Sequence, residues 1–308
     1  MAPTVRQAAA DDYEAVAAFT EDTWADRDVG DYIADVFREW VASDGPSQRT
    51  LVAEVDDDVV SLCQGVLLSD HEAWAQGMRV HPDFRGEGVA VALTEAVFEW
   101  ARDRGATVCR NLVFSWNDAG LGQSRAVGFE PATQFRFAHP EPDADAEAPA
   151  EASGELSVTD DAATAWSCWQ RSAATAELRG LMLDPTETWA VSELSRQTLL
   201  DVADDERVFA VQGEDGTRAA AVRVRDYESM DGETRYAEYG FATWKDIPAA
   251  RTIFAAIKRD AAALGVDEVR VVIPETARHV SDAAYARANV GDAPEFVLEK
   301  DLSEVSRR

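Results

Sequence analysis

The residues best suited to chemistry lie in the segment VHPDFRGEGVAVAL, which spans residues 80–93. An apolar, strand-like run precedes the segment and a helical pattern follows it. The first turn of a helix exposes unpaired N–H groups and the positive end of its dipole, which together attract anions. Gly86 and Gly88 let a ligand approach the backbone and can adopt positive φ. Ala90 keeps the helix start open, and the donors of Arg85 suit phosphate oxygens. The segment predicts a pyrophosphate site.

Two common phosphate-binding motifs do not match this turn. Its spacing differs from the G-x-x-x-x-G-K-[ST] pattern of a P-loop and from the G-x-G-x-x-G of a dinucleotide-binding βαβ unit. A purely structural alternative is that the helix start needs only a tight glycine turn.

Period-2 and helical patterns predict a mixed α and β first half. The expected strands are residues 5–8, 50–55, 59–68, 72–80, 106–114 and 129–137. The expected helices are residues 12–19, 30–41, 89–105 and 116–127.

The second half repeats this order. Its expected strands are residues 217–227, 233–244, 267–275 and 294–302, and its helices are residues 249–265 and 278–291. Residues 233–265 align with residues 72–105 with one residue missing in the turn, where TWKDIPAAR has no glycine. We interpret the chain as a tandem duplication whose second copy has lost its ligand loop.

A stretch rich in Pro, Ala and acidic residues separates the halves. Such a composition cannot bury enough apolar surface to order itself and is typical of a tether. We therefore expect a catalytic domain at 1–140, a linker at 141–154 and a degenerate domain at 155–308.

The segment Arg85-Gly86-Glu87-Gly88-Val89-Ala90 resembles the (Gln/Arg)-x-x-G-x-(Gly/Ala) signature of the GNAT N-acetyltransferase superfamily. Asn117 and the Gly128-Phe129 pair stand where the family has its later motifs. The resemblance covers about residues 5–139. It implies an α+β fold with two GNAT-like domains, each a central mixed, mostly antiparallel sheet flanked by helices.

The same resemblance assigns roles to residues around the turn. Residues 85–90 would hold the pyrophosphate of acetyl-CoA, the acetyl donor. The exposed backbone of Met78, Arg79 and Val80 would pair with the pantetheine arm like an added strand. The Met78 N–H is the expected donor to the developing oxyanion. Asn117 is either a pantetheine ligand or an N-cap, and both roles can hold.

The catalytic acid and base depart from the family pattern. Family members often place a carboxylate at the position of Trp74 or Gln76, and neither is acidic here. Glu72 shares their face by alternation and could act through water. Alternatively, Glu72 is a solvated carboxylate of the hairpin without a catalytic role. The tyrosine common four residues before the glycine of the Gly-Phe pair is replaced by Ser124. An α-amine is already partly neutral near pH 8, so the reaction does not require a strong base. The thiolate can leave without full protonation, so a strong general acid is not required either.

The acceptor amine needs a pocket next to the thioester. Trp24, Tyr32, Trp74 and Gln76 are its candidate walls, although aromatic residues at these spacings also suit a core. A narrower similarity to the vertebrate histidine N-acetyltransferase group rests on residues 30–41, 49–62 and 72–90. It implies a free amino acid or similar small amine as acceptor.

Composition restricts the partners. The formal net charge is −29, with 58 acidic and 29 basic residues, of which only three are lysines. This balance disfavours nucleic acid as a partner and is typical of a protein working in concentrated salt. No apolar run suits a membrane span, and neither a secretory signal nor metal-ligand spacing is visible. We expect a cytoplasmic acyltransferase without metal. A non-catalytic acyl-CoA sensor is the alternative, because the catalytic set is incomplete.

Overall fold

The computed structural model describes residues 3–21, 23, 30–147, 156–203, 205 and 207–303. The chain forms two compact units. Unit 1 comprises residues 1–113, 117–131 and 297–308, and unit 2 comprises residues 114–116 and 132–296, each within the described ranges. Among the described helices, none combines the length and the apolar character that crossing a membrane requires.

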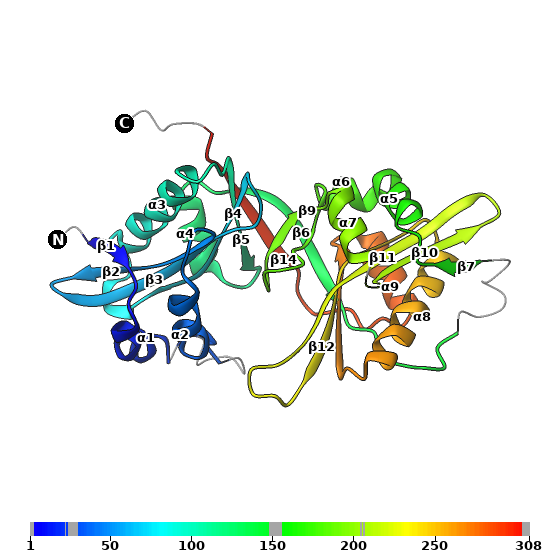
Figure 1. Cartoon of the computed structure of the whole chain (residues 1–308), viewed down its shortest axis with the longest axis horizontal. Coiled ribbons are helices and arrows are strands. Elements are labelled where there is room, and N and C mark those ends of the chain that lie inside the picture. Colours follow the sequence, from blue (N-terminus) through cyan, green and yellow to red (C-terminus); the bar gives the residue numbers. More distant parts are fainter. Residues whose placement is uncertain are drawn as a thin grey trace. The chain divides into compact units, whose positions relative to one another are not determined.

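Unit 1 is a sheet covered on both faces (Figure 1). Its strands follow the order β1-β2-β3-β4-β5-β14. All pairings with a described register are antiparallel except the parallel β4–β5 pair. The strands are β1 Thr4–Gln7, β2 Gln48–Val55, β3 Asp58–Leu67, β4 Glu72–Val80, β5 Val108–Phe114 and β14 Glu295–Asp301.

The helices of unit 1 divide between the two faces of this sheet. They are α1 Tyr13–Thr20, α2 Ile33–Ser43, α3 Val89–Arg102 and α4 Asp118–Ala126, with short 3-10 turns η1 Ala10–Asp12 and η2 Pro82–Phe84. A Cβ placed on Gly65 of β3 would meet Trp100 and Val97 of α3. On the opposite face, Val52 and Leu62 share a core cluster with apolar residues of α1 and α2. The sheet is therefore buried on both sides.

Unit 2 repeats the plan with strand order β6-β13-β12-β11-β10-β7 and a parallel β12–β13 pair. Its strands are β6 Glu130–Ala138, β7 Ser157–Thr159, β8 Leu181–Leu183, β9 Val191–Glu193, β10 Val208–Gly213, β11 Gly216–Glu228, β12 Arg235–Trp244 and β13 Glu268–Pro274. Its helices are α5 Ala162–Arg171, α6 Ala173–Glu177, α7 Arg196–Ala203, α8 Ile247–Leu264 and α9 Ala277–Tyr285. Helix α8 packs its apolar face into the main core of this unit.

The units do not follow the linear division at residue 140. Most of β6, expected to close the first half, pairs with β13 in unit 2. Most of β14, expected to close the second half, lies in unit 1 next to β5. The alternating pattern of a strand shows that it has one buried face but carries no information about which sheet it joins.

The first residues of the expected linker are ordered. The Asp143 N–H donates to the Lys258 carbonyl at 3.0 Å, Ala146 is buried, and Arg259 donates to the Ala146 carbonyl. Residues 141–147 therefore pack along α8, contrary to the tether that their composition suggests. Residues 148–154 lie outside the described residues.

Candidate functional site: a glycine turn after a bulged strand

The predicted anion site has the backbone geometry that its sequence indicates. Gly86 and Gly88 adopt φ of +81° and +83°. A Cβ at either position would meet nothing within 4 Å, so the space above the turn is open. Gly88 is the N-cap of α3 and supplies no capping side chain. The N–H groups of the first turn of α3 are therefore left for an external acceptor.

The other residues of this turn contribute unequally. Arg85 and Glu87 are exposed, and Arg85 Nε donates to the Val80 carbonyl at 3.3 Å. Val89 is buried at 2% exposure, so only its backbone faces a ligand, and Ala90 is partly exposed. The turn thus offers backbone donors and one guanidinium.

Strand β4 carries a bulge just before the turn. Leu62 pairs with Arg79 and Gln64 pairs with Gln76, so Gly77 and Met78 together face Cys63 alone. Gly77 has φ of +66°, and a Cβ there would lie 2.7 Å from the ring of Trp40. A glycine inside a strand pattern is the sequence signal that could have revealed the bulge.

Strand β4 stops pairing with β5 before it reaches the bulge. In the described chain their pairing runs only from Glu72 opposite Val108 to Trp74 opposite Arg110. The backbone of β4 that follows, through the partly exposed Met78, Arg79 and Val80, is not paired with β5 there. A strand edge beyond the end of such a pairing can add an extended ligand arm through backbone hydrogen bonds.

The Arg79 side chain serves the protein interior. Its Nε donates to Asp31 Oδ2 at 2.6 Å, and its guanidinium carbon lies 5.6 Å from the Tyr32 ring centroid. Asp31 also accepts from the Ile33 N–H at 3.0 Å, which fixes the start of α2. Arg79 can therefore meet a ligand through its backbone. Its partner Asp31 is absent from the residues that the sequence predicts for the site, because 48 positions separate the two.

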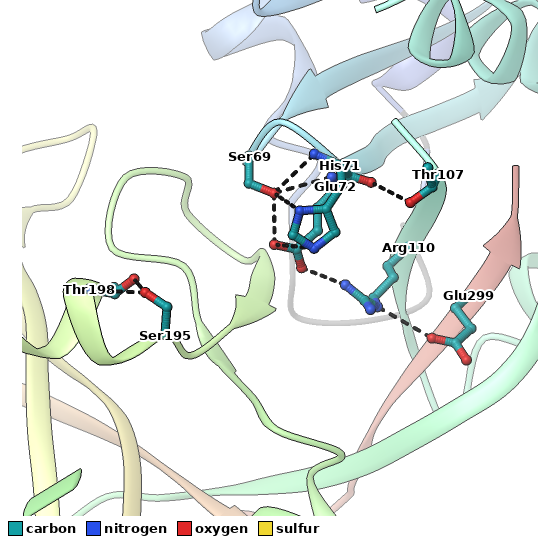
Figure 2. Close-up of polar contacts among 8 residues, drawn as sticks. All are labelled: Ser69, His71, Glu72, Thr107, Arg110, Ser195, Thr198 and Glu299. Atoms are coloured by element: carbon teal, nitrogen blue, oxygen red, sulfur yellow. Dashed lines mark hydrogen bonds and ion pairs between the residues drawn. The ribbon is translucent and has the colours of Figure 1, made fainter. Parts of the chain in front are cut away.

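Glu72 is not the solvated carboxylate of a hairpin. It is buried at 3% exposure, and its Oε1 lies 2.6 Å from Arg110 Nη1 (Figure 2). Ser69 Oγ donates to its other oxygen at 3.0 Å, and Arg110 also pairs with Glu299 of β14 at 3.4 Å. The carboxylate opens β4, six residues before Met78, and acts there as a structural anion.

The second proposed catalytic residue is also buried. Ser124 of α4 is 1% exposed, and its hydroxyl accepts a hydrogen bond from Asn111 Nδ2 at 2.9 Å. Asn117 is the N-cap of α4, because its Oδ1 accepts from the Gly120 N–H at 2.9 Å. Burial makes Ser124 a structural hydroxyl, and the capping role of Asn117 is the one that the contacts display.

The candidates for the acceptor pocket fall into three groups. Trp74 is 1% exposed and belongs to the core, so it is not a pocket wall. Tyr32 and Trp40 are partly exposed and meet edge to face at 6.2 Å beside the bulge. Gln76 is partly exposed and donates to Gln64 Oε1 at 2.8 Å. Trp24 lies outside the described residues.

The equivalent turn of unit 2 is occupied by the protein itself. Residues 81–88 separate β4 from α3, whereas only residues 245–246 separate β12 from α8. The loop of unit 2 is therefore shorter by more than the one residue that the sequence alignment predicts. Asp246 caps α8 by accepting from the Ala249 N–H at 3.0 Å, and it pairs with Arg218. Burial, the largest single influence, would raise the pKa of Asp246, but its hydrogen bonds to Arg218 and Ala249 hold that pKa below its usual value. A side-chain anion thus takes the position that an external phosphate would need.

Comparisons with known proteins agree with this geometry. A sequence model of the acetyltransferase (GNAT) family matches residues 6–129. An acetyltransferase of Pectobacterium atrosepticum is 31% identical over 128 residues, which are 39% of this chain and 82% of that protein. The structure of a GCN5-related N-acetyltransferase from Sphaerobacter thermophilus is similar, with a TM-score of 0.62, 15% identity and coverage of 97% of this chain and 96% of that one.

A tandem GNAT protein from the clavulanic acid biosynthesis pathway shares the fold over 99% of this chain and 100% of its own, with a TM-score of 0.53 and 14% identity. The predicted α+β fold is therefore confirmed over both halves of the chain. Its sequence and its fold together show that the chain belongs to the GNAT family of acetyltransferases.

Proposed function

We propose that the protein transfers the acetyl group of acetyl-CoA to the amine of a small molecule, and that it has one coenzyme site, in unit 1. The observation that carries the proposal is the turn at Gly86 and Gly88. Both glycines have positive φ, open space lies above them, and the uncapped start of α3 follows directly. Backbone donors in this arrangement suit a pyrophosphate. Local geometry has to supply the attraction, because the net charge of −29 repels anions.

The remaining parts of unit 1 suit the rest of the reaction. Acetyl-CoA supplies the acetyl group as an activated thioester. The part of β4 that follows its pairing with β5 would hold the pantetheine arm, and the Met78 N–H at the bulge would donate to the carbonyl oxygen as charge develops on it. Both reactants then meet in one ternary complex, which makes the attack effectively unimolecular.

The acceptor approaches from the side of α2. Tyr32 and Trp40 lie beside the bulge and are partly exposed. Because Glu72 is held in a buried ion pair, the proposed reaction uses no carboxylate base. It therefore requires an acceptor amine that is already partly neutral at the working pH. A free amino acid or a similar small amine fits this requirement.

Two measurements test the proposal. Titration calorimetry with coenzyme A should give one site per chain. Thiol release from acetyl-CoA, followed over a panel of amino acids, amino sugars and alkylamines, should identify the acceptor. Binding without thiol release on any amine would favour a sensor of acyl-CoA and contradict the proposal.

The acidic composition supports a cytoplasmic protein that works in concentrated salt. Fifty-eight acidic residues against 29 basic ones repel one another in the folded state, and salt screens that repulsion. Thermal unfolding in increasing KCl should therefore shift to higher temperature. A melting temperature that falls or stays constant would contradict this part of the proposal.

A further inference from the structure

A row of polar side chains crosses three strands of unit 1 and ends at the bulge. Thr50 of β2 is the direct partner of Gln64 of β3, which is the direct partner of Gln76 of β4. Direct partners place their side chains on the same face of the sheet, within reach of one another. Thr50 and Gln64 are 0% and 1% exposed, whereas Gln76 is partly exposed. The row therefore leads from the interior to the proposed reaction site.

Hydrogen bonds join this row into a chain that starts at Asp44, the residue after α2. The Thr50 hydroxyl lies 3.0 Å from Asp44 Oδ1, and the Thr50 N–H also donates to that oxygen at 2.8 Å. Gln64 Nε2 donates to Thr50 Oγ1 at 3.1 Å. Gln76 Nε2 donates to Gln64 Oε1 at 2.8 Å.

The carboxylate at the start determines the direction of every later bond. An ionised Asp44 can only accept, so the single hydroxyl proton of Thr50 points toward it. The hydroxyl oxygen then accepts from Gln64, which must turn its NH2 group to Thr50 and its oxygen to Gln76. Gln76 in turn must direct its NH2 group to Gln64. The oxygen of the Gln76 amide is thereby directed away from the row.

We propose that Gln76 Oε1 accepts a hydrogen bond from the N–H of the acceptor amine, and that Asp44, Thr50 and Gln64 are positioning residues that fix this orientation. The inference rests on the function proposed above. Gln76 immediately precedes the bulge of Gly77 and Met78. An amine whose N–H is held by this amide oxygen would lie next to the bulge, where the Met78 N–H would hold the carbonyl oxygen.

The chemistry of an amide restricts the acceptor. The nitrogen lone pair forms the new N–C bond, the C–S bond breaks, and its electron pair leaves on the sulfur of coenzyme A. A carboxamide does not titrate in the physiological range, so the proton of the acylated amine passes to solvent. The acceptor must therefore arrive neutral and must carry an N–H, which selects primary and secondary amines.

Three variants test the relay, with glycinamide and the fastest amine of the panel as acceptors. Gln76→Leu should lower kcat/KM for the amine by about 3- to 10-fold, the range that one hydrogen bond supplies, while the affinity for coenzyme A is unchanged. Thr50→Val should lower kcat/KM for the amine by a similar or smaller factor. The double variant should be no slower than Gln76→Leu, because Thr50 acts only through Gln76. Thr252→Val, which removes the hydroxyl of a buried threonine in unit 2, is the matched control and should not change kcat/KM.

The pH dependence separates this role from that of a titrating base, and the unchanged affinity for coenzyme A separates it from a general loss of structure. Since an amide does not titrate, the loss in Gln76→Leu should be the same at about pH 6 and about pH 9, and the rising limb of kcat/KM should follow the pKa of each acceptor amine.

Unchanged kcat/KM in Gln76→Leu, or fold losses that multiply in the double variant, would overturn the inference and leave the proposed function intact. Coenzyme A binding without acetylation of any amine by the parent protein would instead overturn both.

Discussion

Glu72 and Arg110 form a buried ion pair in unit 1, with 2.6 Å between Oε1 and Nη1 and side-chain exposures of 3% and 8%. The pair joins the first residues of β4 to β5, and Arg110 extends the link to Glu299 of β14. A carboxylate held in this way stabilises the sheet at the end where β4 and β5 are still paired. Its position in the chain is six residues before Met78 of the bulge.

Replacing Glu72 by Gln should affect stability much more than catalysis. The substitution removes the shorter of the two ion pairs of Arg110 and leaves only the one with Glu299, which should cost about 2 kcal/mol. Urea unfolding should show this loss, while kcat of the folded protein should change by less than about threefold. Glu99→Gln on the exposed side of α3 is the control and should change neither quantity. A loss of kcat of about a hundredfold or more without loss of stability would identify Glu72 as the base.

Gly88→Glu should abolish coenzyme A binding. The substitution places a carboxylate in the open space above the first turn of α3 and introduces a side chain at φ of +83°, which costs about 1 kcal/mol. Calorimetry should show binding weaker by about a hundredfold or more, about 2.7 kcal/mol. Gly232→Glu makes the same change at an open glycine with φ of +71° in unit 2 and should bind like the parent. Equal affinity of the Gly88 variant and the parent would show that the turn is not the coenzyme site.

Ser124→Ala should keep most of the activity. The hydroxyl is buried and bonded to Asn111, and a thiol of pKa near 8.5 can leave as the thiolate. We expect kcat within about threefold of the parent and a loss of about 1 kcal/mol in unfolding free energy, because Asn111 loses one partner. Thiol release and urea unfolding measure the two quantities. Complete loss of turnover in a folded variant would make Ser124 the general acid.

Glu295 should make the protein less stable as the pH rises. Burial raises the pKa of this carboxyl from 4.5 to about 7, and its buried Oε2 has no hydrogen-bond partner within the described chain. The folded state therefore holds a proton that the unfolded state has released between pH 4.5 and 7. Stability present below pH 4.5 is lost through that window, by up to about 3 kcal/mol.

Glu295→Gln tests this dependence directly. The neutral amide should leave stability near pH 5 almost unchanged and raise the melting temperature near pH 8, so that the parent and the variant differ most at high pH. Identical pH profiles of the melting temperature would show that Glu295 titrates normally.

The elements that the sequence predicted lie where their patterns indicate, including the two glycines at positive φ and the helix that follows them. No prediction covered β7–β10 and α5–α7, which lie between the linker and residue 216. The environments of single side chains depended on distant residues instead. Glu72 has the sequence setting of a hairpin carboxylate, and only the fold brings Arg110, 38 positions later, next to it. Trp74 and Ser124 likewise became buried through packing that no short motif describes.

Strand partners were the other feature that the sequence did not predict. β6 and β14 each combine polar residues with a short apolar stretch, and neither sequence indicates which sheet the strand completes. Hydrogen bonding along a strand edge is the same for any partner, so pairing is decided by the fit of whole units. The exchange of these two strands between the units therefore had no signal in the chain.

The inclusion of residues 297–303 in unit 1 has a consequence for biosynthesis. On the ribosome every residue of unit 2 emerges before this segment does. Unit 1, which holds most of the residues that match the GNAT family model, is thus begun first and completed last, and translation that stops before residue 297 would leave it without part of β14.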